Sequence, residues 1–204
     1  MNRVTAPDAA KPNRRAELLA LAAGLFAERG LRATTVRDIA DSAGILSGSL
    51  YHHFDSKESM VDEILRGFLD DLFGRYREIV GAGLGSRDTL EALVLSSYES
   101  FDRFHSAVAI YQTEAKRLRD SERFAYIEEY NREFRELWHQ VLTAGVADGS
   151  FRAELDVELA YRFLRDTVWV AVRWYRPGGP VTVENLAKQY LTIVLDGLTA
   201  PGHS

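Results

Sequence analysis

The sequence predicts an all-α protein of about nine helices, and three observations support this fold class. Apolar residues recur every three or four positions through most of the 204 residues, which is helical spacing. Strict alternation of apolar and polar residues is not sustained over a useful length. Glycine- and proline-containing segments divide the chain into pieces of helical length. With 46% hydrophobic residues, the chain can bury a substantial core.

The first thirty residues predict an arm followed by one amphipathic helix. Residues 1–12 contain two prolines and few apolar side chains, so we expect a disordered arm. Residues 13–30 are expected to form a helix that Gly30 ends. Its apolar face would consist of Leu18, Leu19, Ala22, Leu25 and Phe26.

Residues 34–57 predict two short helices joined by a tight glycine turn. Thr34 and Thr35 can accept hydrogen bonds from the free N–H groups of a helix that follows them. Gly44 stands where a left-handed residue would end that helix. Ser47 can cap a second helix that runs to about His53. This is the build of a helix-turn-helix, in which the second helix enters the DNA major groove.

One side of the second short helix carries side chains that are too polar and too small for a buried core position. Leu50 and Phe54 can anchor it inward, whereas the other sides carry Ser47, Gly48, Ser49, Tyr51 and His52. Small residues permit a close approach to DNA, and hydroxyl groups can donate to phosphate oxygens. Lys57 follows at the start of the next helix, where a bound phosphate would explain a cation. The alternative is a helical hairpin with a merely polar surface.

The rest of the chain predicts further helices. A long helix should run from Lys57 to about Val80, and the glycine-rich residues 81–86 should break the chain. Later breaks are expected at 148–150 and 177–180. The predicted helices cover about 88–105, 107–119, 121–148, 156–176 and 182–198. We therefore expect a DNA-binding domain at 13–56 and a second domain at 57–200.

Composition excludes several classes of protein. The chain has no cysteine, which excludes disulfides, thiol catalysis and thiolate metal sites. It has no apolar run of membrane-spanning length and no signal-peptide pattern at its start, so we expect a cytoplasmic protein. The net charge of −5 does not exclude DNA binding, which needs only a local basic face. Arg37 is a candidate for that face, with Arg3, Lys11, Arg14, Arg15 and Arg32.

A second informative pattern lies at residues 161–176. On one helix, four arginines and a tryptophan would fall within an arc of about 80°; they are Arg162, Arg165, Trp169, Arg173 and Arg176. Arginine forks suit phosphate, and an indole offers a face for apolar packing. The pattern favours a polyanionic ligand with an apolar part, such as a coenzyme A thioester. The alternative is a solvated face, or salt bridges to acids of a neighbouring helix.

Other residues could line the apolar end of such a ligand site. Tyr98, His105 and Gln112 are candidates for polar residues in the wall of the site. The aromatic candidates are Phe68, Phe101, Phe104, Tyr111, Phe124, Tyr130, Phe134 and Trp138. Each of them could equally be a core residue.

The helix-turn-helix segment resembles the DNA-binding domain of TetR-type transcriptional repressors over about residues 13–60. The matching residues are Phe26, Gly30, Thr34, Thr35, Ile39, Ala40, Ala43, Gly44, Ser47, Gly48, Leu50, Tyr51, His53, Phe54, Ser56 and Lys57. The resemblance implies that Thr35, Ser47, Ser49, Tyr51, His52 and Lys57 face DNA. It also implies phosphate contacts for Tyr51 and Lys57, and a structural role for His53 and Phe54. With Thr34, Arg37 and Gly48, these residues make up the predicted DNA-binding set.

Segment 165–180, together with the helix-turn-helix, is similar to actinobacterial cholesterol-catabolism repressors of the KstR type. This resemblance implies a homodimer that pairs through its last two long helices and binds an inverted-repeat operator. It also implies release from DNA by a CoA thioester of a steroid fragment, with no cofactor and no metal. Arg165 and Trp169 are then the first candidates for ligand contacts, and Arg162, Arg173 and Arg176 are the second.

Three alternatives remain at the level of the sequence. The effector could be a fatty acyl-CoA or a lipophilic drug. The chain could be a small helical enzyme acting on acyl-CoA, but it lacks a Gly-rich phosphate loop and metal-spaced histidines. It could also be an architectural DNA-binding dimer without a ligand. We expect a regulator and not an enzyme.

Overall fold

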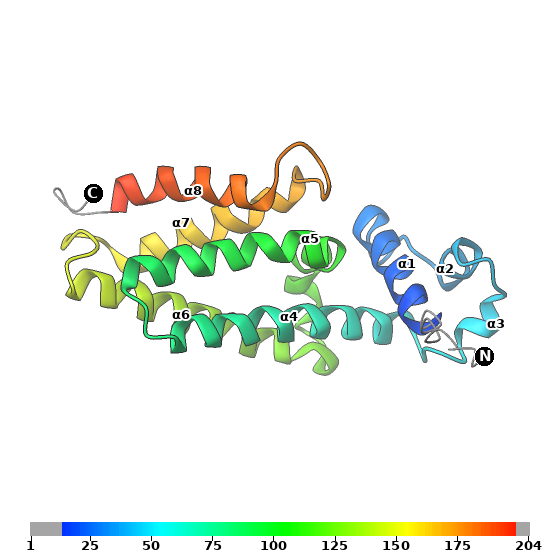
Figure 1. The fold of residues 1–204 in the computed structure, drawn as a ribbon. Coiled ribbons are helices and arrows are strands. Elements are labelled where there is room, and N and C mark those ends of the chain that lie inside the picture. Colours follow the sequence, from blue (N-terminus) through cyan, green and yellow to red (C-terminus); the bar gives the residue numbers. More distant parts are fainter. Residues whose placement is uncertain (1–13, 199–204) are drawn as a thin grey trace, which may run out of the picture. The chain divides into compact units, whose positions relative to one another are not determined.

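The computed structural model describes residues 14–198, which form eight α-helices and two short 3-10 helices (Figure 1). No β-strand occurs within these residues, in agreement with the predicted fold class. The predicted arm at 1–12 lies outside the described residues. The elements are α1 (Arg14–Arg29), α2 (Val36–Ser42), α3 (Ser47–Leu50), α4 (Lys57–Gly81), α5 (Ser86–Leu118), η1 (Glu122–Phe124), α6 (Tyr126–Ala147), α7 (Val157–Val170), η2 (Ala171–Arg173) and α8 (Val183–Leu198).

The chain divides into two compact units, and the division falls within α4, after Val61. The first unit holds α1, α2, α3 and the first turn of α4. Its core is built from one apolar face of each helix, and consists of Leu18, Ala22, Phe26, Ile39, Ala40, Leu50, Phe54 and Met60. Gly30 and Gly44 end α1 and α2 with φ values of 84° and 67°, which glycine adopts without strain.

Helix α2 has the cap that the sequence predicts. The Thr35 hydroxyl accepts a hydrogen bond from the Asp38 N–H at 3.1 Å, and the Asp38 carboxylate accepts one from the Thr35 N–H at 2.7 Å. This reciprocal capping box satisfies two donors that the helix N-terminus would otherwise leave free. It also lowers the pKa of Asp38, because the carboxylate accepts from the Thr35 side chain and backbone.

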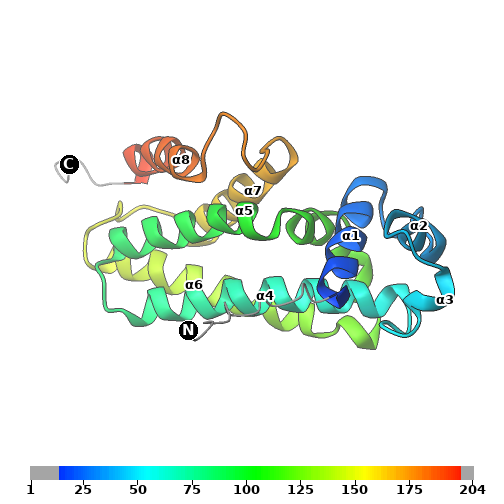
Figure 2. The ribbon, with the colours of Figure 1, turned by 45° about the vertical axis from the view of Figure 1, so that its right-hand side comes forward.

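The second unit contains the rest of α4 with α5, α6, α7 and α8. Helix α5 packs against α6, α7 and α8, and Figures 1 and 2 both show α8 running beside it. Large aromatic side chains from these helices fill its core. Phe73, Tyr76 and Trp138 are among the most completely buried. Within residues 14–198, no helix is both long and apolar enough to cross a membrane.

Several predicted helix boundaries were wrong. Helix α6 begins at Tyr126 and not at about residue 121, because the 3-10 helix η1 precedes it. Ser47 is the first residue of α3 and not its cap, and α3 ends at Leu50. The predicted helices at 88–105 and 107–119 are one element, α5, with a kink at Phe104 (φ −135°, ψ 31°). Helix α7 ends at Val170, because the chain tightens there into the 3-10 turn η2. A 3-10 turn takes three residues and not 3.6, so the wheel drawn through residue 176 does not hold beyond Val170.

Candidate DNA-reading surface and ligand cavity

The DNA-reading candidates lie on α3 and the turn that follows it. Leu50 and Phe54 are buried at 2% and 5% exposure and fix the short helix against the core. Tyr51 is 57% exposed, and Gly48 and His52 are exposed too. Ser47 and Ser49 are half-buried. The arrangement presents a narrow strip of small, hydroxyl-bearing and aromatic side chains, which suits contact with a DNA backbone and groove.

Helix α2 contributes two further exposed candidates. The Arg37 side chain is 84% exposed and lies 3.7 Å from the Asp41 carboxylate, a distance typical of a loose surface pair. Thr35 is exposed, although its hydroxyl is also engaged in the α2 cap. His53, for which a structural role is expected, is exposed, and its ring centroid lies 6.4 Å from that of Phe54.

Thr34 does not belong to this surface, and its inclusion in the predicted DNA-binding set is corrected. Its side chain is fully buried. The hydroxyl donates to the Gly30 carbonyl oxygen at 2.9 Å and lies 3.3 Å from that of Leu25. Thr34 therefore ties the loop after α1 to that helix, and its neighbour Thr35 performs the capping.

Lys57 has a structural role that explains a cation at the start of α4. Its ammonium group donates to the carbonyl oxygens of Leu31 at 2.6 Å and of Thr34 at 3.0 Å. The sequence suggested a bound phosphate as the reason for this cation. The hydrogen bonds to these two carbonyl groups already explain a cation at this position. They also join the start of α4 to the loop between α1 and α2.

Four of the nine ligand candidates line a cavity of 290 Å³ in the second unit, between α4, α5, α6, α7 and η2. Arg165, Trp169, Arg173 and Gln112 all line it, as the sequence predicted for a shared site. The remaining wall is mostly apolar and consists of Phe68, Leu69, Leu72, Phe73, Tyr111, Asn131, Phe134, Asp166 and Val170. Such a volume lies near the lower end of the range of about 300–1,000 Å³ for small-molecule pockets.

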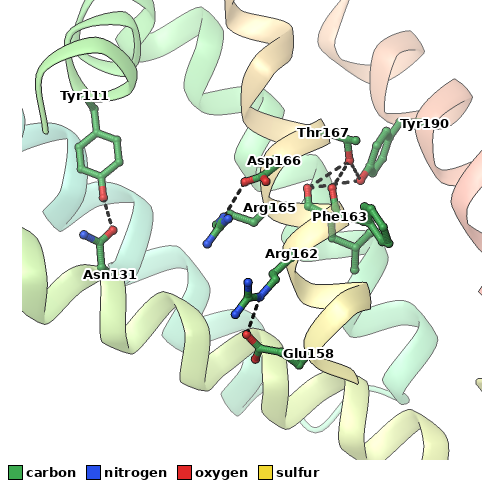
Figure 3. Close-up of polar contacts among 10 residues, drawn as sticks. Tyr111, Asn131, Glu158, Arg162, Phe163, Arg165, Asp166, Thr167 and Tyr190 are labelled. Carbon is green, nitrogen blue, oxygen red and sulfur yellow. Dashed lines mark hydrogen bonds and ion pairs between the residues drawn. The ribbon is translucent and has the colours of Figure 1, made fainter. Parts of the chain in front are cut away.

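Aromatic packing holds Trp169 in the cavity wall. The indole is 7% exposed, and its ring centroid lies 6.1 Å from that of Phe68 and 5.9 Å from that of Phe101. In another part of the wall, the Tyr111 hydroxyl donates to the Asn131 side-chain oxygen at 2.6 Å (Figure 3). Desolvation raises the pKa of Tyr111 well above its usual value, so the hydroxyl stays protonated and can donate.

An open groove of 930 Å³ adjoins the cavity, and six residues line both: Tyr111, Gln112, Asn131, Phe134, Arg165 and Asp166. Its rim carries twice as many cationic as acidic side chains. The cations are Lys116, Arg119, Arg132, Arg135, Arg162 and Arg165, and the acids are Glu128, Glu158 and Asp166. This excess of positive charge favours an anion in the groove.

Carboxylates on α7 pair with three arginines of the groove. Glu158 accepts from Arg162 at 2.8 Å, and Arg165 donates to Asp166 at 2.7 Å (Figure 3). Arg135 on α6 also donates to Glu158, at 2.8 Å. Hydrogen bonds from Arg135 and Arg162 lower the pKa of Glu158 to about 2. Arg162 and Arg165 of the stripe therefore pair with acids of α7 itself, and not with acids of a neighbouring helix, which was the alternative weighed from the sequence.

Four predicted ligand residues lie elsewhere. Phe101 and Trp138 are fully buried core residues, and Tyr98 is 1% exposed. Tyr98 and Phe101 precede the α5 kink at Phe104, whereas the cavity residues of α5 follow it. Trp138 stacks on Phe134, one helical turn before it, at 5.3 Å between centroids. Arg176 lies beyond α7, and its guanidinium donates to the neighbouring Tyr175 carbonyl oxygen at 3.0 Å.

Other lining residues were missed from the sequence. They are Asn131, Arg132 and Arg135 on α6, Lys116 on α5 and Arg119 directly after α5, and they carry no pattern of their own. They alternate with acids along helices, which is typical of a solvated surface. Only the packing of α5 and α6 beside α7 brings them to the arginine stripe.

Comparison with known proteins defines the class. Residues 18–64 match the family model for bacterial regulatory proteins of the tetR family, and residues 83–198 match the Tetracyclin repressor-like C-terminal domain. The chain belongs to the TetR family of helix-turn-helix transcriptional repressors. It is thus a member of a regulator family and not of an enzyme family.

Individual members of the family show high similarity to this chain. The chain is 76% identical over 191 residues to the HTH-type transcriptional repressor KstR2 of Rhodococcus jostii, spanning 94% of each chain. The structure of the ketosteroid transcriptional regulator KstR2 of Mycobacterium tuberculosis superimposes with a TM-score of 0.90 at 59% identity, covering 93% of this chain and 97% of that one. AibR in complex with isovaleryl coenzyme A and operator DNA has the same fold, with a TM-score of 0.76, 21% identity and coverage of 89% and 97%.

Proposed function

We propose that the effector of this repressor is a coenzyme A thioester whose acyl group derives from a steroid ring. The observation that carries this proposal is the continuity between an apolar cavity and a basic groove, with Arg165 in the wall of both. An acyl-CoA has the same two-part chemistry, because an apolar acyl group is joined to a phosphate-bearing nucleotide. The steroid class rests on the likeness to the ketosteroid regulator KstR2.

The apolar half of the ligand would lie in the cavity. Three aromatic residues, Phe68, Phe134 and Trp169, line the cavity, and aromatic rings suit packing against a flat, fused-ring acyl group. Gln112 and the Tyr111–Asn131 pair offer polar atoms that could bond a keto or carboxylate oxygen on the ring.

The anionic half would lie in the groove. Guanidinium groups bind phosphate through paired N–H donors. Arg132 and Arg135 on α6 and Arg119 at the end of α5 line the groove in addition to the stripe on α7. Arg165 stands where the cavity meets the groove, so we assign it the junction between the acyl group and the CoA chain.

The same proposal includes a homodimer that pairs through α7, η2 and α8. Phe163 and Trp174 are 68% and 56% exposed, and Ile193 on α8 is 75% exposed. Large apolar side chains in such positions are typical of an interface, and a two-fold axis would bury each patch against its copy. The dimer would place two α3 helices in successive major grooves of an inverted-repeat operator, about 34 Å apart, in the cytoplasm.

Helix α4 would carry the signal. Lys57 at its start bonds carbonyl groups of the first unit, and Phe68, Leu69 and Leu72 along the same helix line the cavity. A ligand that displaces these residues would move the attachment of the reading head. Coupling of about 1–3 kcal/mol per site is enough to release the operator.

Operator binding followed by fluorescence anisotropy tests the proposal. A duplex selected by the protein from a randomised pool is titrated with and without a steroid-derived acyl-CoA, free CoA and palmitoyl-CoA. We expect only the steroid thioester to weaken operator binding at low concentration. An operator affinity that none of the three changes, with folded protein, would refute an acyl-CoA effector. A response to palmitoyl-CoA alone would point instead to a fatty acyl-CoA regulator.

A further inference from the structure

Leu46 is an exposed apolar residue that the DNA-reading surface described above does not use. Its side chain is 81% exposed, more than any other large apolar side chain in the described part of the chain. It directly precedes α3, and its carbonyl oxygen accepts the first hydrogen bond of that helix, from the Ser49 N–H at 2.9 Å.

Leu46 leaves the start of α3 without a side-chain cap. As the N-cap of α3, with φ −73° and ψ 143°, it offers no side-chain acceptor to the free N–H groups of the helix. Thr35 and Asp156 supply that acceptor at the starts of α2 and α7. Serine, threonine, aspartate and asparagine are strongly preferred at such positions. Leucine here neither caps the helix nor contributes to the core, so folding alone does not explain it.

The residues around Leu46 make it the dominant apolar group on this edge of the helix. Ser47, Gly48 and Ser49 follow it with small side chains, and Leu50 points into the core. In a helix-turn-helix, the N-terminal residues of the second helix meet the base edges of the major groove. The apolar group that a base pair presents in that groove is the C5-methyl of thymine.

We propose that Leu46 is a specificity-determining residue that packs against a thymine methyl group in each operator half-site. Its side chain supplies the apolar surface, and the small residues after it let the helix approach the base edges closely. The proposal concerns operator readout alone and does not depend on the identity of the effector.

A thymine-to-uracil scan tests the proposal, because deoxyuridine removes only the methyl group. The duplex is one that the protein itself selects from a randomised pool, and each thymine is replaced singly. For the natural protein we expect one thymine per half-site whose replacement weakens binding about fourfold, equivalent to about 0.8 kcal/mol for one buried methyl-sized group. Leu46→Ala should lose that sensitivity and retain sensitivity elsewhere.

Leu46→Ser provides an independent readout. It should raise the melting temperature, because serine caps α3, while it weakens operator binding and removes the uracil effect. Leu84→Ala is the matched control, since Leu84 is another exposed leucine, at 49%, in the loop before α5. This control should leave the uracil scan unchanged.

The outcomes that would overturn the proposal are distinct. One is a scan in which no thymine is sensitive in the natural protein. Another is a set of uracil penalties that are the same in the natural protein and in Leu46→Ala. A third is an equal loss of affinity of Leu46→Ala for operator and for random DNA, which would assign Leu46 a role without sequence readout.

Discussion

The two units of this protein differ in how far apart in the sequence their functional residues lie. The reading surface draws its candidates from residues 35–52, a single stretch of two helices and a turn. The cavity draws its wall from α4, α5, α6, α7 and η2, and so spans residues 68–173. A local site can be inferred from spacing and caps, whereas a site assembled by tertiary packing shows only the part that one helix contributes.

The largest expected effect comes from Arg165→Met, which keeps the length of the side chain and removes its charge. Loss of a charge-assisted hydrogen bond costs about 1.5–3 kcal/mol, so affinity for the steroid acyl-CoA should fall about 10- to 150-fold. Operator affinity without ligand should stay the same. Calorimetry of the thioester and anisotropy of the operator measure the two quantities.

Arg75→Met is the matched control for this change. Both arginine side chains are 44% exposed, and each pairs with a nearby aspartate of its own helix, but Arg75 does not line the cavity. If Arg75→Met weakened ligand binding as much as Arg165→Met, the junction role of Arg165 would be wrong.

Lys57→Met tests the connection between the reading head and α4. Two carbonyl groups lose their donor, and an unsatisfied, partly buried polar group costs about 1–3 kcal/mol. We expect a lower free energy of unfolding in urea together with weaker operator binding. Weaker operator binding at unchanged stability would instead assign Lys57 a direct phosphate contact.

Tyr51→Phe tests the reading surface by itself, because it removes only an exposed hydroxyl. If that group donates to a phosphate oxygen, operator affinity should fall about tenfold per half-site. Thioester binding and melting temperature should not change, since Tyr51 lies outside the core and outside the cavity. An unchanged operator affinity would remove Tyr51 from the reading surface.

The smallest effect is the pH dependence of stability that Glu158 contributes. Arg135 and Arg162 depress the pKa of its carboxyl to about 2 in the folded protein, below the ordinary value of 4.5. A depressed pKa gives stability that is present above pH 4.5 and is lost as pH falls toward 2. Glu158→Gln should therefore be less stable than the natural protein at pH 7, by a difference that shrinks below pH 4.5. Urea unfolding of both proteins at pH 7, 5 and 4 measures the difference in their free energies of unfolding. A difference that stays constant over this pH range would mean that the ion pairs of Glu158 contribute nothing to stability.

The sequence predicts more of the first unit than of the second. The all-α class, the Thr35 cap and the turn at Gly44 follow from local chemistry, and the structure confirms them. Thr34 was misplaced because two adjacent threonines look alike in sequence, and only the packing of the loop after α1 decides which one is buried. The DNA contacts themselves remain predictions.

The cavity could be predicted only in part. Arg165, Trp169 and Arg173 formed a pattern on one helix, so they were found together. Arg135 and Asn131 were not found, because their part in the site depends on how α6 packs beside α7. Tyr98 and Phe101 were misassigned, since the kink at Phe104 separates them from the cavity-lining part of α5.

The central claim is that ligand in the cavity and DNA on the reading surface oppose each other, and thermodynamic reciprocity gives its most direct test. If the thioester weakens operator binding by some factor, operator DNA must weaken thioester binding by the same factor. Titration calorimetry would measure binding of the steroid acyl-CoA to the free protein and to the protein saturated with operator. We predict a lower affinity in the DNA complex, by the factor that anisotropy gives for release. Equal affinities for the free and the DNA-bound protein would contradict the account.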